Sequence, residues 1–177
     1  MIGIRNAHVP GDIEVIRQLW TEHLTLGNNE LESQYGFRLP VQEAVEADIA
    51  DLGKYLPPDG RLILAWKGDQ PAGIGCMKRL GPTTAEFKRM FVRPPFRGLG
   101  IGRAILERLR DACRDEGYTA VRLDSARFMT SAHALYRSVG FVEIPPYPET
   151  EIPEPYRQHW VFMERQVTTA WTPVQPR

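Results

Sequence analysis

The stretch VRPPFRGLGIGR, residues 92–103, decides how this chain is interpreted. It follows an apolar run ending at Phe91, turns through two prolines and three glycines, and enters a long segment with apolar residues at helical spacing. The first amides of a helix have no carbonyl partner inside that helix, and glycines ahead of it leave those amides open to a ligand. The stretch therefore predicts an anion site at the start of a helix from Gly98 to Glu116.

The charge around this turn differs from the charge of the whole chain. The 177 residues hold 22 basic and 22 acidic side chains, and this zero net charge argues against nucleic-acid or membrane binding by bulk charge. Residues 88–110 nevertheless hold seven basic side chains against one acid, Glu107. This local excess favours a phosphate-bearing ligand at the turn.

Common phosphate and metal motifs do not fit the sequence. A P-loop needs a lysine followed by serine or threonine, which is missing here, and a dinucleotide fingerprint would need a third glycine where Arg103 stands. The histidines have no metal-ligand spacing to one another or to the cysteines, so we expect no metal site. They are His8, His23, His133 and His159.

The rest of the chain predicts a mixed α/β (α+β) domain. The expected order is one strand, two helices, three strands, a helix, a strand, a helix and two strands. The expected strands are 2–7, 61–66, 71–80, 84–92, 120–124, 141–144 and 159–165, and the expected helices are 12–24, 40–56, 98–116 and 130–139. Gly27, Asn28 and Asn29 are predicted to break the first helix, and the proline-rich residues 145–155 to form a stiff exposed loop.

The length suits a single domain with its own core, which we expect at residues 1–166, followed by a loosely held tail at 167–177 that includes Trp171. No apolar stretch approaches the length of a membrane span, and the N-terminus lacks a signal-peptide pattern, so a cytosolic location is expected. Cys76 and Cys113 are expected to be reduced, buried thiols.

The pattern Arg97-x-x-Gly100-x-Gly102, directly after a strand, resembles the pyrophosphate motif of the GNAT superfamily of N-acetyltransferases. Two longer blocks carry the resemblance: EFKRMFVRPPFRGLGIGRAILERL at 86–109 and SAHALYRSVGFVEIPPY at 131–147. The resemblance implies the GNAT fold, a mixed sheet of about seven strands with flanking helices and with the fourth and fifth strands splayed apart. It also implies acetyl-coenzyme A as the cosubstrate, bound between those two strands.

The same resemblance implies which residues hold the cosubstrate. The amides of the turn would bind the pyrophosphate, and the fourth strand would pair with the pantetheine arm. The implied set is Met90, Phe91, Val92, Arg97, Gly98, Leu99, Gly100, Ile101, Gly102, Arg103 and Ser131. The sequence departs from the family at Met129, where many members have an asparagine, so Ser125, Thr130 and Ser131 are the polar candidates on that side.

An attack by an amine on a thioester needs an oxyanion donor, a proton acceptor and a proton donor. A backbone amide near Met90 is the candidate oxyanion donor. Tyr136 matches the tyrosine that resembles the family's general acid, and a phenol with a pKa of about 10 is protonated at neutral pH. Glu86, six residues before Val92, resembles the position of a catalytic glutamate in some family branches, acting directly or through water.

The acceptor is expected between the first two helices and the loop at 145–155, where several glutamates would attract a cation. We therefore predict direct acetyl transfer, in a ternary complex, to the primary amine of a small molecule such as an amino acid or a polyamine-like metabolite. A protein or peptide N-acetyltransferase and a non-catalytic acyl-CoA sensor are the alternatives. The sequence leaves open a homodimer through the last strand, and no nucleic-acid or membrane partner is expected.

Overall fold

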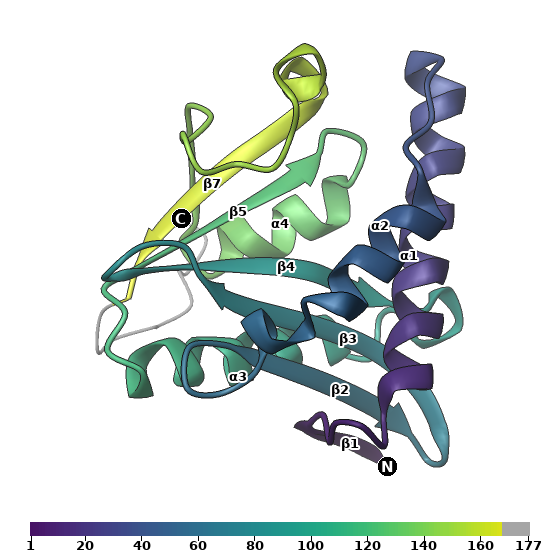
Figure 1. Ribbon diagram of the computed structural model, residues 1–177, viewed down its shortest axis with the longest axis vertical. Coiled ribbons are helices and arrows are strands. Elements are labelled where there is room, and N and C mark those ends of the chain that lie inside the picture. The colour runs from purple at the N-terminus through teal and green to yellow at the C-terminus, as the bar shows by residue number, and fades with distance from the viewer. Residues whose placement is uncertain (168–177) are drawn as a thin grey trace.

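The computed structural model describes residues 1–167, and Figure 1 shows them arranged around one twisted sheet. Its seven strands lie in the order β1-β2-β3-β4-β5-β7-β6, and β4 with β5 is the parallel pair among otherwise antiparallel neighbours. The strands are β1 Ile2–Asn6, β2 Arg61–Lys67, β3 Gln70–Arg79, β4 Thr84–Val92, β5 Ala120–Ala126, β6 Val142–Ile144 and β7 Trp160–Gln166. The predicted order of elements and the mixed sheet are confirmed.

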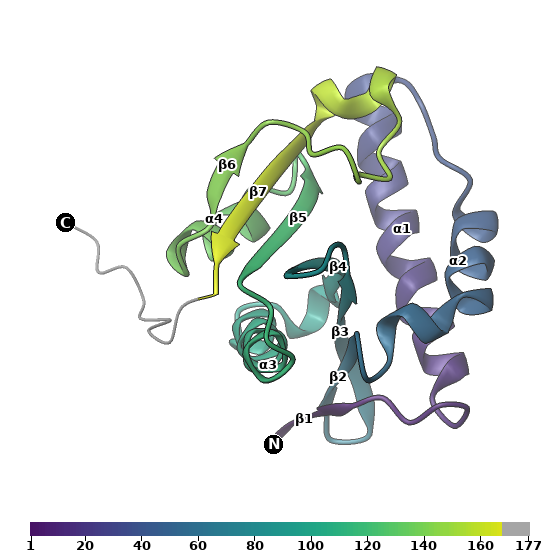
Figure 2. The same ribbon diagram turned by 60° about the vertical axis from the view of Figure 1, so that its left-hand side comes forward.

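Helices cover both faces of this sheet, as Figure 2 shows. One face packs on α1 and α2 through a cluster that includes Trp20, Val45 and Ile74, and the other packs on α3 through Ile105 and Leu109. The helices are α1 Ile13–Tyr35, α2 Val41–Ala50, α3 Ile101–Asp115 and α4 Thr130–Ser138, with short 3₁₀ turns at Leu52–Tyr55, Pro94–Phe96 and Glu154–His159. No helix in the described part of the chain is long and apolar enough to cross a membrane.

The centre of the sheet opens because β4 and β5 separate. Their parallel pairing runs from Thr84 opposite Ala120 to Phe87 opposite Leu123, and no pair joins the two strands beyond that point. β5 continues beside β7 as far as Ala126, whereas β4 continues beside β3 as far as Val92. The predicted splay of the fourth and fifth strands is therefore confirmed.

A bulge interrupts β4 where it leaves β5. Ile74 lies opposite Phe91 and Cys76 lies opposite Lys88, so β4 holds one residue more than β3 over this interval. Arg89 has a φ of 54°, the one positive value at a non-glycine residue in the described range. The bulge turns the backbone of β4 beside the opening in the sheet.

The predicted break in the first helix is wrong. Helix α1 continues past Gly27 and ends at Tyr35, where Gly36 adopts a φ of 74° and its N–H donates to the carbonyl of Glu32. The buried Asn28 holds the continuation in place, because its Nδ2 donates to the Leu39 carbonyl at 2.7 Å and its Oδ1 accepts from the Leu39 N–H at 2.9 Å. A tertiary contact thus offsets the low helix propensity of the glycine–asparagine run.

Replacing Asn28 with alanine should lower the free energy of unfolding by about 2 kcal/mol, because both backbone groups of Leu39 lose their buried partner. That loss corresponds to a fall in Tm of about 5 °C for a chain of this size, measurable by circular dichroism. Asn29→Ala, at the exposed neighbouring position, is the matched control and should leave Tm nearly unchanged. Equal effects of the two substitutions would contradict this account.

The other sequence predictions differ from the structure in small ways. The helix expected to run to residue 56 ends at Ala50 and is followed by a 3₁₀ turn, and the strand expected to end at residue 124 extends to Ala126. Both cysteines are free and buried, as predicted. The expected tail lies outside the described residues except for Val167, and so does Trp171.

Candidate functional site

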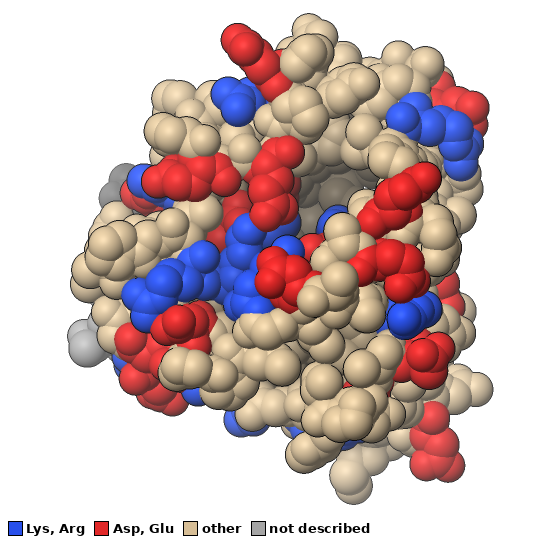
Figure 3. All heavy atoms as spheres, in the orientation of Figure 1, with Lys and Arg blue, Asp and Glu red and all other residues tan. Residues whose placement is uncertain are grey.

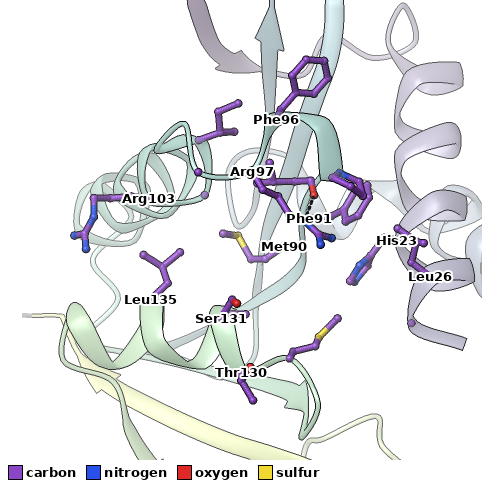
Figure 4. Close-up of a pocket in the computed structure, with 18 of the residues that line it drawn as sticks. His23, Leu26, Met90, Phe91, Phe96, Arg97, Arg103, Thr130, Ser131 and Leu135 are labelled. Carbon is purple, nitrogen blue, oxygen red and sulfur yellow. Dashed lines mark hydrogen bonds between the residues drawn. The ribbon is translucent and has the colours of Figure 1, made fainter. Parts of the chain in front are cut away.

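A cavity of about 840 Å³ occupies the gap between the splayed strands. Figure 4 shows its walls, which come from the free half of β4, the N-terminal end of α3, one face of α4 and the middle of α1. The lining residues are His23, Leu26, Gly27, Glu30, Met90, Phe91, Val92, Pro94, Phe96, Arg97, Gly98, Gly100, Ile101, Gly102, Arg103, Phe128, Met129, Thr130, Ser131, Ala132, Leu135 and Tyr136. A cavity of this size holds a ligand larger than one small metabolite.

Most of the predicted site residues line this cavity. Of the predicted cosubstrate residues, Leu99 alone is absent from the wall, because its side chain is exposed on the surface. Tyr136 lies in the wall, whereas the other predicted catalytic residue, Glu86, does not. Ser131 and Thr130 face the cavity from the start of α4, and they are the polar groups beside Met129.

The N-terminal end of α3 provides backbone donors for an anion. The Arg97 amide donates to the Pro94 carbonyl at 3.2 Å and the Ala104 amide donates to Gly100 at 3.0 Å. Between them, within the described chain, no backbone carbonyl accepts from the amides of Gly98 through Arg103. Gly98 and Gly100 both have a φ of 78°, and a Cβ at either would meet nothing within 4 Å, so each opens onto free space.

Two arginines add charge at this end of the cavity. Arg97 donates from Nε to the Val92 carbonyl at 3.1 Å, and Arg103 donates to the Ser138 hydroxyl at 2.9 Å. Across residues 1–167 neither forms an ion pair with a carboxylate. Arg93 differs, because it makes two hydrogen bonds with Glu22, at 2.7 and 2.6 Å. The free amides and these two unpaired guanidinium groups fit a pyrophosphate.

Tyr136 presents its ring to the cavity from α4, with 5% of its surface exposed. Burial raises the pKa of its phenol above the ordinary value, and the negative charge of Asp124 raises it further. The hydroxyl therefore carries its proton at neutral pH and is able to donate it.

Glu86 lies on β4 but is completely buried under the loop that follows β6. The Tyr147 hydroxyl donates to its Oε1 at 2.6 Å, and the Nζ of Lys78 lies 3.3 Å from its Oε2. Burial raises the pKa of this carboxyl, while Lys88 and the Tyr147 hydrogen bond act in the opposite direction. The structure therefore places Glu86 outside the cavity wall, in a polar cluster with Tyr147 of the loop and the lysines of β3 and β4.

The acidic segments predicted to attract a cation are largely paired. Glu151 binds Lys78 and Lys88, Glu149 lies 3.4 Å from Arg122, and Glu22 binds Arg93. Figure 3 accordingly shows red and blue side chains next to one another around the hollow on this face. Glu30 is the acidic residue that lines the cavity. The attraction of these acidic segments for a cationic acceptor is therefore weaker than the number of glutamates in the sequence suggested.

His23 is a cavity residue that the sequence interpretation missed. Its ring lies 5.3 Å from that of Phe91, and both face the cavity (Figure 4). Burial, together with the charges of Arg89 and Arg97, lowers the pKa of His23 to about 3, so the imidazole is neutral. The sequence did contain a signal for this position. His23 lies three residues after Trp20 and four after Leu19, so helical spacing puts a polar imidazole on the otherwise apolar face of α1.

Comparison with known proteins assigns the family. Residues 19–141 match the family model described as the acetyltransferase (GNAT) family. The chain belongs to the GNAT family.

An uncharacterised GNAT relative, an N-acetyltransferase of Schizosaccharomyces pombe, is 28% identical over 155 residues, covering 86% of this chain and 90% of that protein. An IAA acetyltransferase of Azospirillum brasilense is 34% identical over 67% of this chain and 76% of its own length. An N-acetylaspartate synthetase of Danio rerio is 32% identical over 55% of this chain but 36% of its own.

Solved GNAT structures have the same fold. A Staphylococcus aureus acetyltransferase superposes with a TM-score of 0.73 at 19% identity, covering 95% of this chain and 100% of that one. An N-acetyltransferase from Thermoplasma acidophilum, solved with coenzyme A, gives a TM-score of 0.68 at 16% identity, covering 94% of this chain and 99% of that one. The family match and the N-acetyltransferase relatives make this GNAT chain an acyl-CoA-dependent N-acetyltransferase, with acetyl-CoA as cosubstrate. Across the described residues no group of His, Cys, Asp or Glu side chains is arranged to hold a metal.

Proposed function

We propose that the protein acetylates the primary amine of a small molecule, by direct attack of the amine on acetyl-CoA in a ternary complex. The observation that carries this proposal is a roof, defined as the second half of α1 and residues 145–159, next to the α1 side of the cavity. Leu31 of α1 packs with Tyr147 and Trp160, and the ring of Tyr35 lies 4.1 Å from that of His159. Figure 2 shows the two segments meeting.

On the α1 side the roof forms part of the cavity wall, through Leu26, Gly27 and Glu30, and we infer that residues 145–159 narrow the acceptor end by packing on this half of α1. Phe128 and Met129 line the cavity and pack against the same apolar cluster as the roof. A second stacked pair extends this contact just past the end of α1: the ring centroids of Phe37 and Tyr156 lie 4.5 Å apart. A folded polypeptide needs an open groove at this place, whereas a small amine does not. The relatives named for IAA and for N-acetylaspartate support a small acceptor, and a peptide acceptor is the alternative.

The cavity's own groups supply the steps of the reaction. The amine nitrogen attacks the thioester carbonyl carbon, and the backbone amide at Met90 in the β4 bulge donates to the developing oxyanion. The C–S bond then breaks, Tyr136 gives its proton to the departing sulfur, and the nitrogen, which attacked as the neutral amine, gives one proton through water to Glu86. The phenol regains a proton from solvent.

Direct attack also agrees with the positions of the cysteines. Cys76 and Cys113 lie in the two core clusters, away from the cavity wall. Burial raises the pKa of the Cys113 thiol to about 12 and raises that of Cys76 as well, so neither is a thiolate at neutral pH. An acetyl-cysteine intermediate therefore has no candidate in the described chain. Initial-rate plots for the two substrates should intersect, as a ternary complex requires.

Glu86 is our proposed proton acceptor, reached through water because it does not line the cavity. Glu86→Gln should lower kcat/KM at neutral pH by about a hundredfold and remove the acid limb of the pH profile. Tyr147→Phe removes a hydrogen bond that lowers the pKa of Glu86, so that pKa rises and the acid limb should move to higher pH. Glu149→Gln, on the same loop but paired with Arg122, is the control. If the Glu86→Gln profile equals that of the wild type, the proton acceptor lies elsewhere.

A screen of amine acceptors tests the proposed function. Purified protein and acetyl-CoA are incubated with amino acids, polyamines, aminoglycosides and short peptides, and free thiol is detected. We expect thiol release with a small amine and none above background with peptides. Turnover of peptides alone would favour the peptide N-acetyltransferase, and acetyl-CoA binding without turnover of any amine would favour the sensor.

A further inference from the structure

Arg89 occupies the strained position of the β4 bulge. Its φ of 54° lies in the left-handed region, which costs an ordinary side chain roughly 1 kcal/mol. Arg89 and Met90 have no opposite residue in the register with β3, since Lys88 pairs with Cys76 and Phe91 with Ile74. Regular strand pairing therefore does not hold these two residues in place, and side-chain contacts must do so.

On the α2 face of the sheet, Asp48 holds Arg89. Arg89 donates from both Nε and Nη2 to Asp48 Oδ2, at 2.9 and 2.7 Å. The other oxygen, Oδ1, lies 2.9 Å from Lys54 Nζ and accepts from the Tyr55 hydroxyl at 3.4 Å. Asp48 is 6% exposed, so this contact is shielded from water. Both oxygens of the carboxylate thus have partners, and α2 is tied to the bulge.

On the α3 face, Met90 fills the space above a glycine of β3. A Cβ at Gly75 would lie 2.6 Å from Met90 Sδ and 2.5 Å from Ile105 Cγ2, so a side chain at residue 75 would displace Met90 or Ile105. Met90 also lines the cavity. The two bulge residues are therefore fixed from opposite faces, Arg89 by a helix remote from the cosubstrate and Met90 by the core under α3.

We propose that Arg89 and Asp48 form a positioning pair, which holds the β4 bulge so that the Met90 amide points at the thioester carbonyl. This inference rests on the proposed function, because it assumes that this amide receives the oxyanion. Stabilisation of an oxyanion depends on the donor lying at hydrogen-bond distance from the place where charge develops, and a displacement near 1 Å costs about a hundredfold in rate. Neither side chain lines the cavity.

Arg89→Gly gives the sharpest test. Glycine adopts the positive φ without strain, and Asp48 keeps its ion pair with Lys54, so the substitution removes the link without leaving a buried charge unpaired. We expect kcat to fall at least about tenfold, with KM for acetyl-CoA and the Kd of coenzyme A within about twofold. Coenzyme A has no acetyl carbonyl, so its binding does not need the bulge amide. Asp48→Asn, with Arg89 still present, should show the same loss of kcat.

Glu46→Gln is the matched control, because Glu46 also projects from α2 and pairs with an arginine, Arg17 of α1, without contacting β4. Its kcat should stay within about twofold of the wild type. Wild-type kcat in both Arg89→Gly and Asp48→Asn would overturn the proposal. So would a rise in KM for the amine at constant kcat, which would make Arg89 an acceptor-binding residue. An inactive wild-type protein would instead refute the proposed function, which keeps the two failures distinct.

Discussion

Replacing Tyr136 with phenylalanine should lower kcat by about a thousandfold and leave the Kd of coenzyme A unchanged. The phenol is the donor in the cavity wall whose pKa keeps it protonated, and without it the thiolate must leave unprotonated or take its proton from water. Because that pKa is raised above its ordinary value, any loss of rate from ionisation of the phenol should begin above about pH 10. Steady-state rates and isothermal titration with coenzyme A measure both quantities.

Tyr118→Phe is the control for this substitution. Tyr118 is also a buried tyrosine, and its hydroxyl donates to the Asp59 carbonyl at 2.9 Å, but it packs at the far end of α3 and does not line the cavity. Its loss should cost stability and leave kcat per folded molecule unchanged. Full kcat in Tyr136→Phe at every pH would remove the general acid from the mechanism.

The second large effect is expected at the glycine turn. Gly100→Glu places a carboxylate among the open amides at the start of α3, where the pyrophosphate is expected, and should weaken coenzyme A binding by at least about a hundredfold, or about 2.7 kcal/mol. No protein atom lies within 4 Å of a Cβ built at Gly100, so the fold itself is not blocked. The Kd from calorimetry is the measurement.

Gly117→Glu separates the loss of the site from backbone strain. Gly117 follows the other end of α3 with a φ of 77°, against 78° at Gly100, and it also meets no atom within 4 Å. Both substitutions should lower the free energy of unfolding by about 1 kcal/mol, because each puts a side chain in the left-handed region. Only Gly100→Glu should lose coenzyme A. A similar loss of coenzyme A binding in both variants would mean that backbone strain beside α3, and not the carboxylate among the open amides, causes the loss.

Local features of the sequence predicted the cosubstrate side of the site. The turn at 97–103 is contiguous, Gly98 and Gly100 adopt the conformation that only glycine takes readily, and the helix behind them has regular apolar spacing. Tyr136 was predicted from the resemblance of residues 131–147 to the family, and that block is also contiguous, because α4 and the strand after it are short and close in sequence. The glycine turn and the segment that carries Tyr136 are each formed by residues close together in the chain, so a sequence pattern is enough to predict them.

The acceptor side depends on contacts between distant residues, and there the prediction was weaker. The length of α1 depends on the two hydrogen bonds between Asn28 and the backbone of Leu39. Helix propensity, which is a property of single residues, cannot predict such a contact. The burial of Glu86 depends on Tyr147, 61 residues away. Glu151 of the loop is paired with lysines of β3 and β4, and Glu149 is paired with Arg122 of β5. His23 occupies a position on α1 that helical spacing assigns to the core, although it faces the cavity.

The roof is built on its own apolar cluster, whose buried members are Leu31, Ala126, Tyr147, Trp160 and Phe162, and none of them belongs to the cluster under α3. The buried core of the roof therefore shares no residue with the core under α3, and substitutions in these two cores should have nearly additive effects on the free energy of unfolding. A change of acceptor and a change in cosubstrate affinity can then be combined in one chain without one undoing the other. Under the proposed function, the two substrates would then occupy separately adjustable ends of a single cavity.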